Sequence, residues 1–138
     1  MDNTVCICTS LRQAALATSE FYDKALGPSG LKVTMYRLLK RASEAGRPNI
    51  SELSRIVGLD RSTLGRNLRV LERQNLIRFE GAKDERARVV VLTPEGEAAL
   101  AKARPLWADA QTTMRHLLGD QTDILLDQLV KLNHRNLA

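Results

Sequence analysis

The chain has 138 residues, enough for one domain with a real hydrophobic core, and because only 4% of the residues are aromatic that core is expected to be aliphatic. The formal net charge of +5 favours a polyanionic partner, although many soluble proteins share such a balance. No apolar run is long enough for a transmembrane helix and the N-terminus lacks the pattern of a signal peptide, so we expect a cytoplasmic protein with no membrane partner.

Two helices are predicted in the first third of the chain, at about residues 9–26 and 32–45. Each has apolar residues at helical spacing, and therefore one face suited to burial. Residues 27–30 and 45–48 contain glycine and proline and end the two patterns. The expected inner faces are Leu11, Ala15, Thr18, Tyr22 and Ala25 in the first helix, and Met35, Leu38, Leu39 and Ala42 in the second.

A short helix is predicted over residues 49–57. Its apolar residues recur at i, i+3 and i+4, which places them on one face. Asn49 or Ser51 can cap the start, and Gly58 is placed to end the helix in left-handed backbone. The residues expected on the buried face are Leu53, Ile56 and Val57.

A longer helix follows the turn at Gly58, with Asp60 as its expected cap. Its buried stripe is expected to consist of Leu64, Leu68 and Leu71. The opposite face carries Ser62, Arg66, Arg69 and Arg73. Three arginines on a free face, with Glu72 as the only acid in the helix, are typical of a helix that enters the DNA major groove. The alternative is a basic helix whose arginines contact only solvent.

Two short strands, at residues 76–80 and 89–92, are predicted from alternating and β-branched residues. The turn between them carries Lys83, Arg86 and Arg88. Arginine on a narrow hairpin suits the DNA minor groove, where negative potential is concentrated. A helix-turn-helix followed by such a hairpin predicts a winged helix that binds DNA.

Two more helices are predicted, at residues 95–118 and at about 124–132. Thr93 is the expected cap of the first, Pro94 its first residue, and Pro105 is expected to kink it. Its inner face is expected to contain Ala99, Ala103, Leu106 and Ala110, with Trp107 beside them. The leucine-rich last helix needs a partner, which is either its own domain or a second chain.

The chain resembles the MarR family of winged-helix transcription regulators. The resemblance rests on Asp84-Glu-Arg86, a run of β formers, and Leu92-Thr93-Pro94-Glu95-Gly96, together with Ser51-Glu-Leu53, Arg61-Ser-Thr63, Leu71-Glu-Arg73 and Leu76-Ile77. It covers essentially the whole chain. It implies a mainly α fold with a small β-hairpin wing, in which residues 32–96 form the DNA-binding lobe and residues 1–30 and 97–138 form dimerisation helices of one domain, 1–138.

The resemblance also implies a homodimer on a pseudo-palindromic operator in double-stranded DNA. We expect repression, because a bound dimer occludes the promoter, and activation is the alternative. We assign Ser62, Thr63 and Arg66 to base edges, Arg69 and Arg73 to phosphates, and Arg86, supported by Arg88, to the minor groove. The full set of expected DNA-contacting residues is Arg61, Ser62, Thr63, Arg66, Asn67, Arg69, Arg73, Lys83, Arg86 and Arg88.

The two cysteines, Cys6 and Cys8, leave several interpretations open. Free cysteine usually packs as a small hydrophobe, here at a dimer interface, and two thiolates alone make an incomplete metal site. The N-terminal register also resembles the organic-hydroperoxide-sensing branch of the family, with Cys8 at the reactive position and Arg12 where that branch has a tyrosine. Redox sensing is therefore a second interpretation, with Cys6 as the partner thiol.

The alternative to thiol oxidation is a small aromatic anion as effector. Such a ligand would bind between the dimer helices and the DNA-binding lobe, near Arg12, Tyr22 and Tyr36. No catalytic residues, metal site or cofactor are predicted, because no phosphate loop or metal motif of known spacing is present. The weaker alternatives are a thiol peroxidase that uses Cys6 and Cys8, and a winged helix that contacts only proteins.

Overall fold

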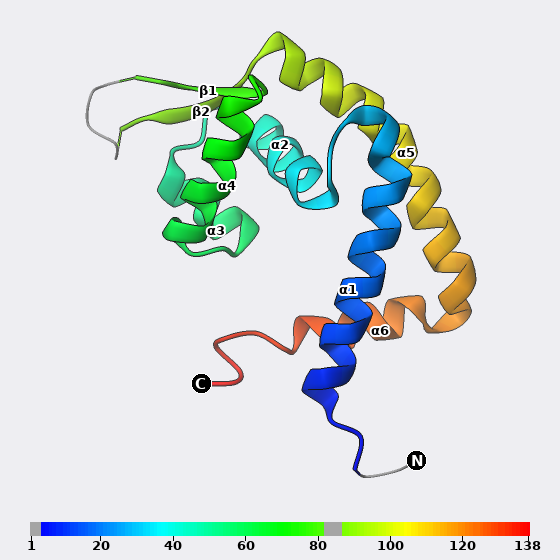
Figure 1. The fold of residues 1–138 in the computed structure, drawn as a ribbon. Helices are drawn as coiled ribbons and strands as arrows, with labels where there is room; N and C mark the ends of the chain where they lie inside the picture. The colour runs from blue at the N-terminus through cyan, green and yellow to red at the C-terminus, as the bar shows by residue number, and fades with distance from the viewer. Residues whose placement is uncertain (1–3, 82–86) are drawn as a thin grey trace.

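The computed structural model describes residues 4–81 and 87–138, and these form helices with one antiparallel hairpin. Figure 1 shows a lobe of short helices and the hairpin at one end, from which α1 and α5 extend side by side. This is the predicted mainly α, winged architecture. The elements are α1 (Ile7–Leu26), η1 (Gly27–Ser29), α2 (Val33–Ala45), α3 (Ile50–Val57), α4 (Arg61–Arg73), β1 (Ile77–Glu80), β2 (Val89–Leu92), α5 (Pro94–Leu118), η2 (Gly119–Gln121) and α6 (Thr122–Val130).

The lobe has an aliphatic core, as the composition predicts. The predicted stripe of α4 is buried in full, since Leu64, Leu68 and Leu71 are each at most 1% exposed. This stripe packs into the cluster that contains Leu39 of α2 and Leu53 of α3. Burial of the leucines turns the arginine face of α4 outward.

The helix-turn-helix begins and ends where its capping residues predict. The Asn49 side chain accepts a hydrogen bond from the Glu52 amide at 2.8 Å, and Gly58 ends α3 with φ +72°. Asp60 caps α4 by accepting from the Thr63 amide, also at 2.8 Å. One detail of the prediction is wrong, because Ile56 is 43% exposed: α3 is short, and α2 and α4 cover only the side that carries Leu53 and Val57.

The hairpin pairs Ile77 with Leu92 and Glu80 with Val89. The segment that precedes α3 lies along the other edge of β2, where the Val90 amide donates to the Pro48 carbonyl at 2.8 Å. The hairpin is therefore anchored to the helix-turn-helix. Lys83, Asp84 and Arg86, which the sequence assigns to its turn, lie outside the described residues.

A joint built from Thr93 connects the hairpin, α4 and α5. The Thr93 hydroxyl donates to the Asn75 carbonyl at 2.6 Å and accepts from the Gly96 amide at 2.9 Å. The Thr93 amide donates to the Leu76 carbonyl at 3.1 Å. Gly96 approaches the same carbonyl so closely that a Cβ built on it would lie 2.0 Å from the oxygen. Thr93 is thus the predicted cap of α5, and it also holds the end of α4.

The α1 and α5 helices pack along each other, and the Tyr22 hydroxyl of α1 donates to the Gln111 side chain of α5. On the predicted inner face of α1 only Ala15 is exposed. The Asp23 side chain accepts from the Val33 amide at 2.8 Å, which ties α1 to the start of α2. Pro105 lies inside α5, which curves along its length (Figure 1).

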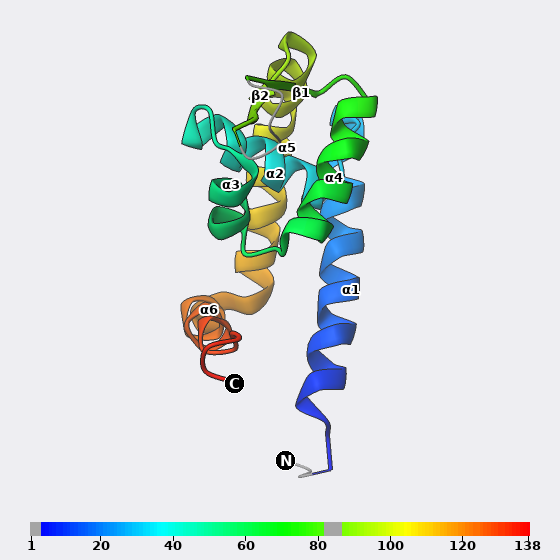
Figure 2. The ribbon, with the colours of Figure 1, turned by 90° about the vertical axis from the view of Figure 1, so that its left-hand side faces the viewer.

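The far end of the molecule presents an apolar surface. Figure 2 shows α6 turning away from the end of α5. Within this chain only Thr122 of α6 is buried. The exposed large apolar residues of α1 and of the C-terminal segment are Ile7, Leu16, Phe21, Leu117, Ile124, Leu125, Leu126, Leu129, Val130, Leu132 and Leu137. None of the helices in the described part of the chain is long and apolar enough to span a membrane.

The Thr93 joint generates a prediction about stability. Gly96→Ala should lower the free energy of unfolding by about 1–3 kcal/mol, because the new methyl group meets backbone that cannot rotate away. Gly65→Ala is the matched control. It also lies in a helix, but its Cβ meets nothing within 4 Å, so it should raise stability by roughly 0.5–1 kcal/mol. Urea denaturation measures both, and equal effects of the two changes would contradict the tight contact.

Candidate nucleic-acid interface

The exposed face of α4 carries a row of basic residues. Arg61, Arg66, Arg69 and Arg73 are all exposed, with Ser62 between the first two. Within the described residues, none of these four guanidinium groups forms a salt bridge. A row of unpaired arginines on a helix fits an anionic groove rather than an apolar partner.

The start of α4 is fixed by polar contacts. Arg61 donates to the Ser51 hydroxyl of α3, which joins the N-terminal ends of the two helices. Asp60 accepts from the Thr63 amide and also from the Thr63 hydroxyl at 3.0 Å. These two hydrogen bonds hold the pKa of the Asp60 carboxyl below its usual range. Asp60 therefore stays ionised at the positive end of the helix dipole.

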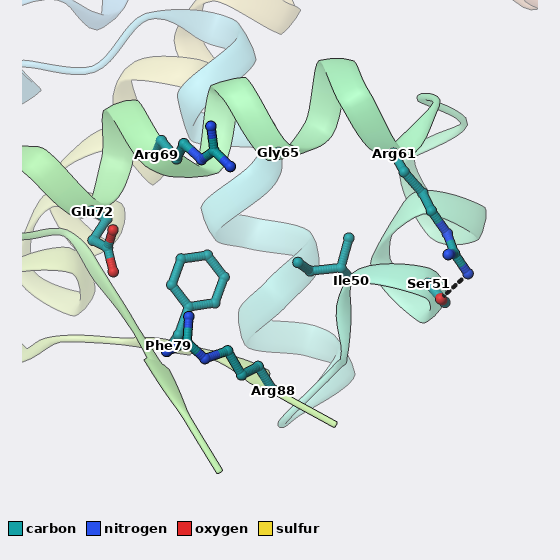
Figure 3. A pocket seen from close by; sticks show the side chains of 8 residues that line it. All are labelled: Ile50, Ser51, Arg61, Gly65, Arg69, Glu72, Phe79 and Arg88. Carbon is teal, nitrogen blue, oxygen red and sulfur yellow. Dashed lines mark hydrogen bonds between the residues drawn. The ribbon is translucent and has the colours of Figure 1, made fainter. Parts of the chain in front are cut away.

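A hollow of about 360 Å³ lies between α4 and the hairpin (Figure 3). Its lining residues come from the start of α3, from α4 and from the hairpin. They are Ile50, Ser51, Arg61, Gly65, Arg69, Glu72, Phe79 and Arg88. Figure 3 shows the side chains of Arg69, from α4, and Arg88, just before β2, both on the Phe79 side of this hollow. The structure thus brings together three of the predicted arginines around one concave surface.

Two further arginines that the sequence analysis did not name meet at Glu80, the last residue of β1 before the turn: Arg78 of the same strand and Arg47 of the loop before α3. Glu80 accepts from Arg78 Nε at 2.6 Å and from the Arg47 guanidinium. These hydrogen bonds, from Arg78 first and then Arg47, hold the pKa of Glu80 below its usual range. Because two cations share one carboxylate, the cluster has a net charge of +1. The alternating pattern of the strand could have identified Arg78 as outward-facing. The sequence could not have identified the Arg47 contact, because it joins segments 33 residues apart.

The other predicted DNA-contacting residues lie in different environments. Ser62 is exposed, while Thr63 is half-buried. Asn67 is half-buried and lines a smaller hollow of about 160 Å³ between α2 and α4, together with Lys32 and Val70. Asn67 therefore lies on the side of α4 that faces α2, and not in the arginine row.

The two cysteines lie at the exposed start of α1. Cys6 is the residue before the first helical turn, and Cys8 lies within that turn. Hydrogen bonds from the Thr9 amide, the Thr9 hydroxyl and the Cys8 amide lower the pKa of the Cys6 thiol. The sequence placed the reactive thiol at Cys8, whereas these hydrogen bonds converge on Cys6.

The residues named for an effector pocket are not gathered in one protomer. Arg12 is exposed on α1, and ten residues of helix, about 15 Å of rise, separate it from Tyr22. Tyr36 is buried and stacks on Trp107 of α5, with ring centroids 6.1 Å apart. Burial raises the pKa of both tyrosines. In this chain Tyr36 therefore has a packing role between α2 and α5.

Comparison with known proteins gives a consistent result. A sequence model of the MarR family matches residues 31–87. The M. tuberculosis transcriptional regulator MosR, solved in complex with DNA, is 38% identical, with a TM-score of 0.80 over 91% of this chain and 92% of that one. A probable transcriptional regulator from Pseudomonas aeruginosa is 26% identical, with a TM-score of 0.81 over 92% and 96% of the two chains. The transcriptional repressor CouR, bound to p-coumaroyl-CoA, is 25% identical, with a TM-score of 0.82 over 92% and 91%. Among curated proteins no match was found.

The family match coincides with the helix-turn-helix and the first strand. The similarity to MosR extends over 91% of the chain and so includes the long helices outside the lobe. The shared architecture belongs to regulators of transcription and not to enzymes. The chain belongs to the MarR family of transcriptional regulators.

Proposed function

We propose that this regulator binds a pseudo-palindromic operator as a homodimer and represses transcription until an effector releases it. The observation that carries the proposal is the row of exposed arginines on α4, none of which forms a salt bridge within the described residues. The DNA in the MosR complex and the role of CouR as a transcriptional repressor support the same function. A repressor acts where the DNA is, and we therefore place the protein in the cytoplasm.

The proposed contacts follow from position on the helix. Ser62 and Arg66, near the N-terminal end of α4, read base edges in the major groove, where arginine makes bidentate bonds to guanine. Arg61, Arg69 and Arg73 lie nearer the phosphates, which fix the register of the protein on DNA. Arg88 extends this contact to the hairpin, while Lys83 and Arg86, outside the described residues, are assigned to the minor groove from the sequence alone.

We further propose that residues 1–30 and 97–138 form the dimer and residues 32–96 the DNA-binding lobe. The apolar surface of α1 and α6 supports this division, because so many exposed leucines and isoleucines are unusual on a monomer. Two-fold symmetry then places two α4 helices in successive major grooves about 34 Å apart. An effector that changes this separation lowers operator affinity.

The effector is proposed from two chemical classes. CouR, similar along the whole chain, is bound to an acyl-CoA of an aromatic acid. An aromatic anion between the lobes, near Arg12, Tyr22 and Tyr36 of the assembled dimer, is one class.

Thiol oxidation is the second class, and the exposed, hydrogen-bonded Cys6 favours it. Its thiolate attacks one oxygen of a hydroperoxide and the O–O bond breaks. The attacked oxygen stays on sulfur as a sulfenic acid, and the other oxygen takes up a proton and leaves as alcohol or water. A second thiol, from Cys8 or a small molecule, then condenses with the sulfenic acid to a disulfide and releases water.

The first test separates contacts with bases from sequence-independent attraction to phosphates. It uses a duplex that the wild-type protein selects from a random pool. Arg66→Ala should cost about 1–3 kcal/mol on the selected duplex and little on unselected DNA. Arg73→Ala should weaken both and reduce the slope of log K against log salt by about one. Fluorescence anisotropy across a salt series measures all of these values. Equal losses on both DNAs for Arg66→Ala would contradict base readout.

The second test concerns the dimer. Leu129→Asp should yield monomer, because it places an unpaired charge in the apolar surface of α6. Since Leu129 is 39% exposed within one chain, the fold of the protomer should survive. Gln128→Asp, on the same helix but not in the apolar set, is the matched control and should remain dimeric. Sedimentation velocity distinguishes these results, and a stable Leu129→Asp dimer would place the interface elsewhere.

The third test concerns the thiols. The depressed pKa of Cys6 means that its thiolate fraction, and hence its alkylation rate, should level off at a lower pH than for an ordinary thiol. At neutral pH iodoacetamide should therefore label Cys6 before Cys8, and Thr9→Val should slow that labelling by removing one hydrogen-bond donor. Peptide mass spectrometry over a pH series reads both rates. Faster labelling of Cys8 would return the reactive role to that residue.

A further inference from the structure

A directed chain of hydrogen bonds lies on the exposed face of α4, formed by Asp60, Thr63 and Arg66. The Asp60 carboxylate accepts from the Thr63 amide at 2.8 Å through one oxygen and from the Thr63 hydroxyl at 3.0 Å through the other. The Thr63 hydroxyl oxygen in turn accepts from Arg66 Nη2 at 3.4 Å. The three residues are spaced at i, i+3 and i+6, and successive members are therefore neighbours on the helix surface.

The direction of this chain follows from the chemistry of each group. A carboxylate can only accept and a guanidinium can only donate. A threonine hydroxyl has a single hydrogen, which here is donated to Asp60. Toward Arg66 the hydroxyl therefore presents a lone pair, and it has no hydrogen left for a base acceptor.

We propose that Thr63 is a positioning residue that sets the Arg66 guanidinium for base readout, and that it does not itself contact a base. The inference rests on the proposed reading of DNA by Arg66 and revises the assignment of Thr63 to a base edge. An arginine side chain has many rotamers, and its freedom is lost on binding. A partner that already restricts the guanidinium in the free protein reduces that loss.

Asp60 is the fixed end of the relay. Its carboxylate is anchored by the Thr63 amide at the start of the helix, and α3 and α4 hold that turn between them through the Arg61 contact with Ser51. Two side-chain hydrogen bonds, from Arg66 to Thr63 and from Thr63 to Asp60, therefore hold the Arg66 guanidinium in a fixed position relative to the backbone of the helix-turn-helix.

Two conservative variants separate a hydroxyl role from a methyl role. Thr63→Val keeps the shape and the methyl group and replaces the hydroxyl with a second methyl, and the backbone amide still bonds to Asp60. Thr63→Ser keeps the hydroxyl and removes the methyl group. If Thr63 positions Arg66, the valine variant should lose roughly fivefold in affinity for the selected duplex, as expected for one hydrogen bond. Its affinity for unselected DNA should not change, and the serine variant should stay within about twofold of the wild type on both DNAs.

A double-mutant cycle completes the experiment. Thr63→Val in an Arg66→Ala background should have no further effect, because the group that it positions is gone. An additive loss in that background would show a separate contact of Thr63 with DNA and overturn the inference. A defect in the serine variant with normal binding by the valine variant would indicate a methyl contact with thymine, and would also overturn it.

The same measurements distinguish failure of the inference from failure of the proposed function. If Arg66→Ala lowers affinity for the selected duplex while Thr63→Val does not, only the positioning role is lost. If Arg66→Ala leaves the preference for the selected duplex intact, both the readout by Arg66 and the relay that serves it are refuted. Thermal melting by circular dichroism confirms that each variant is folded.

Discussion

The end of α4, the hairpin and α5 meet at the carbonyl group of Leu76. The Thr93 amide donates to its oxygen, and Gly96 packs against the same atom at a distance that no side chain permits. Asn75, just before it, has φ +59° and presents its carbonyl to the Thr93 hydroxyl. Because two of these three contacts join backbone groups directly, they fix direction as well as distance. The orientation of α4 therefore follows the first turn of α5.

This constraint explains how a surface far from DNA can influence binding. From the joint, α5 runs 25 residues to the apolar end of the molecule and packs along α1 on the way. The Asp23 contact with the start of α2 and the stacking of Tyr36 on Trp107 make two further connections between the lobes. Pro105 lies between the joint and the contact of Gln111 with Tyr22, where the helix lacks one backbone hydrogen bond. The α5 helix thus links the apolar end of the molecule to the joint that holds α4.

The sequence predicted what local chemistry controls. Helix ends at Asn49, Gly58 and Asp60 are decided by hydrogen bonds within four residues, and the leucine stripe of α4 follows from helical periodicity alone. It failed where the outcome depends on packing between distant segments. Ile56 was expected to be buried, but no described element covers that side of α3. The sharing of Glu80 between Arg47 and Arg78 likewise needs a strand edge and a loop that only the fold brings together.

The arrangement of charges on α4 reduces the stability of the helix in the free protein. Asp60 at the N-terminus and Arg73 at the C-terminus complement the helix dipole, whereas Arg61 in the first turn opposes it. The Ser51 hydroxyl and the nearby Asp60 offset part of that cost, but the arginines still repel one another across an exposed face. Such repulsion is small because water and salt screen it. The Debye screening length is about 8–10 Å under physiological conditions. In the proposed complex the same charges would meet phosphates and release condensed counterions, so the cost to the free helix would be offset by a salt-dependent gain in affinity.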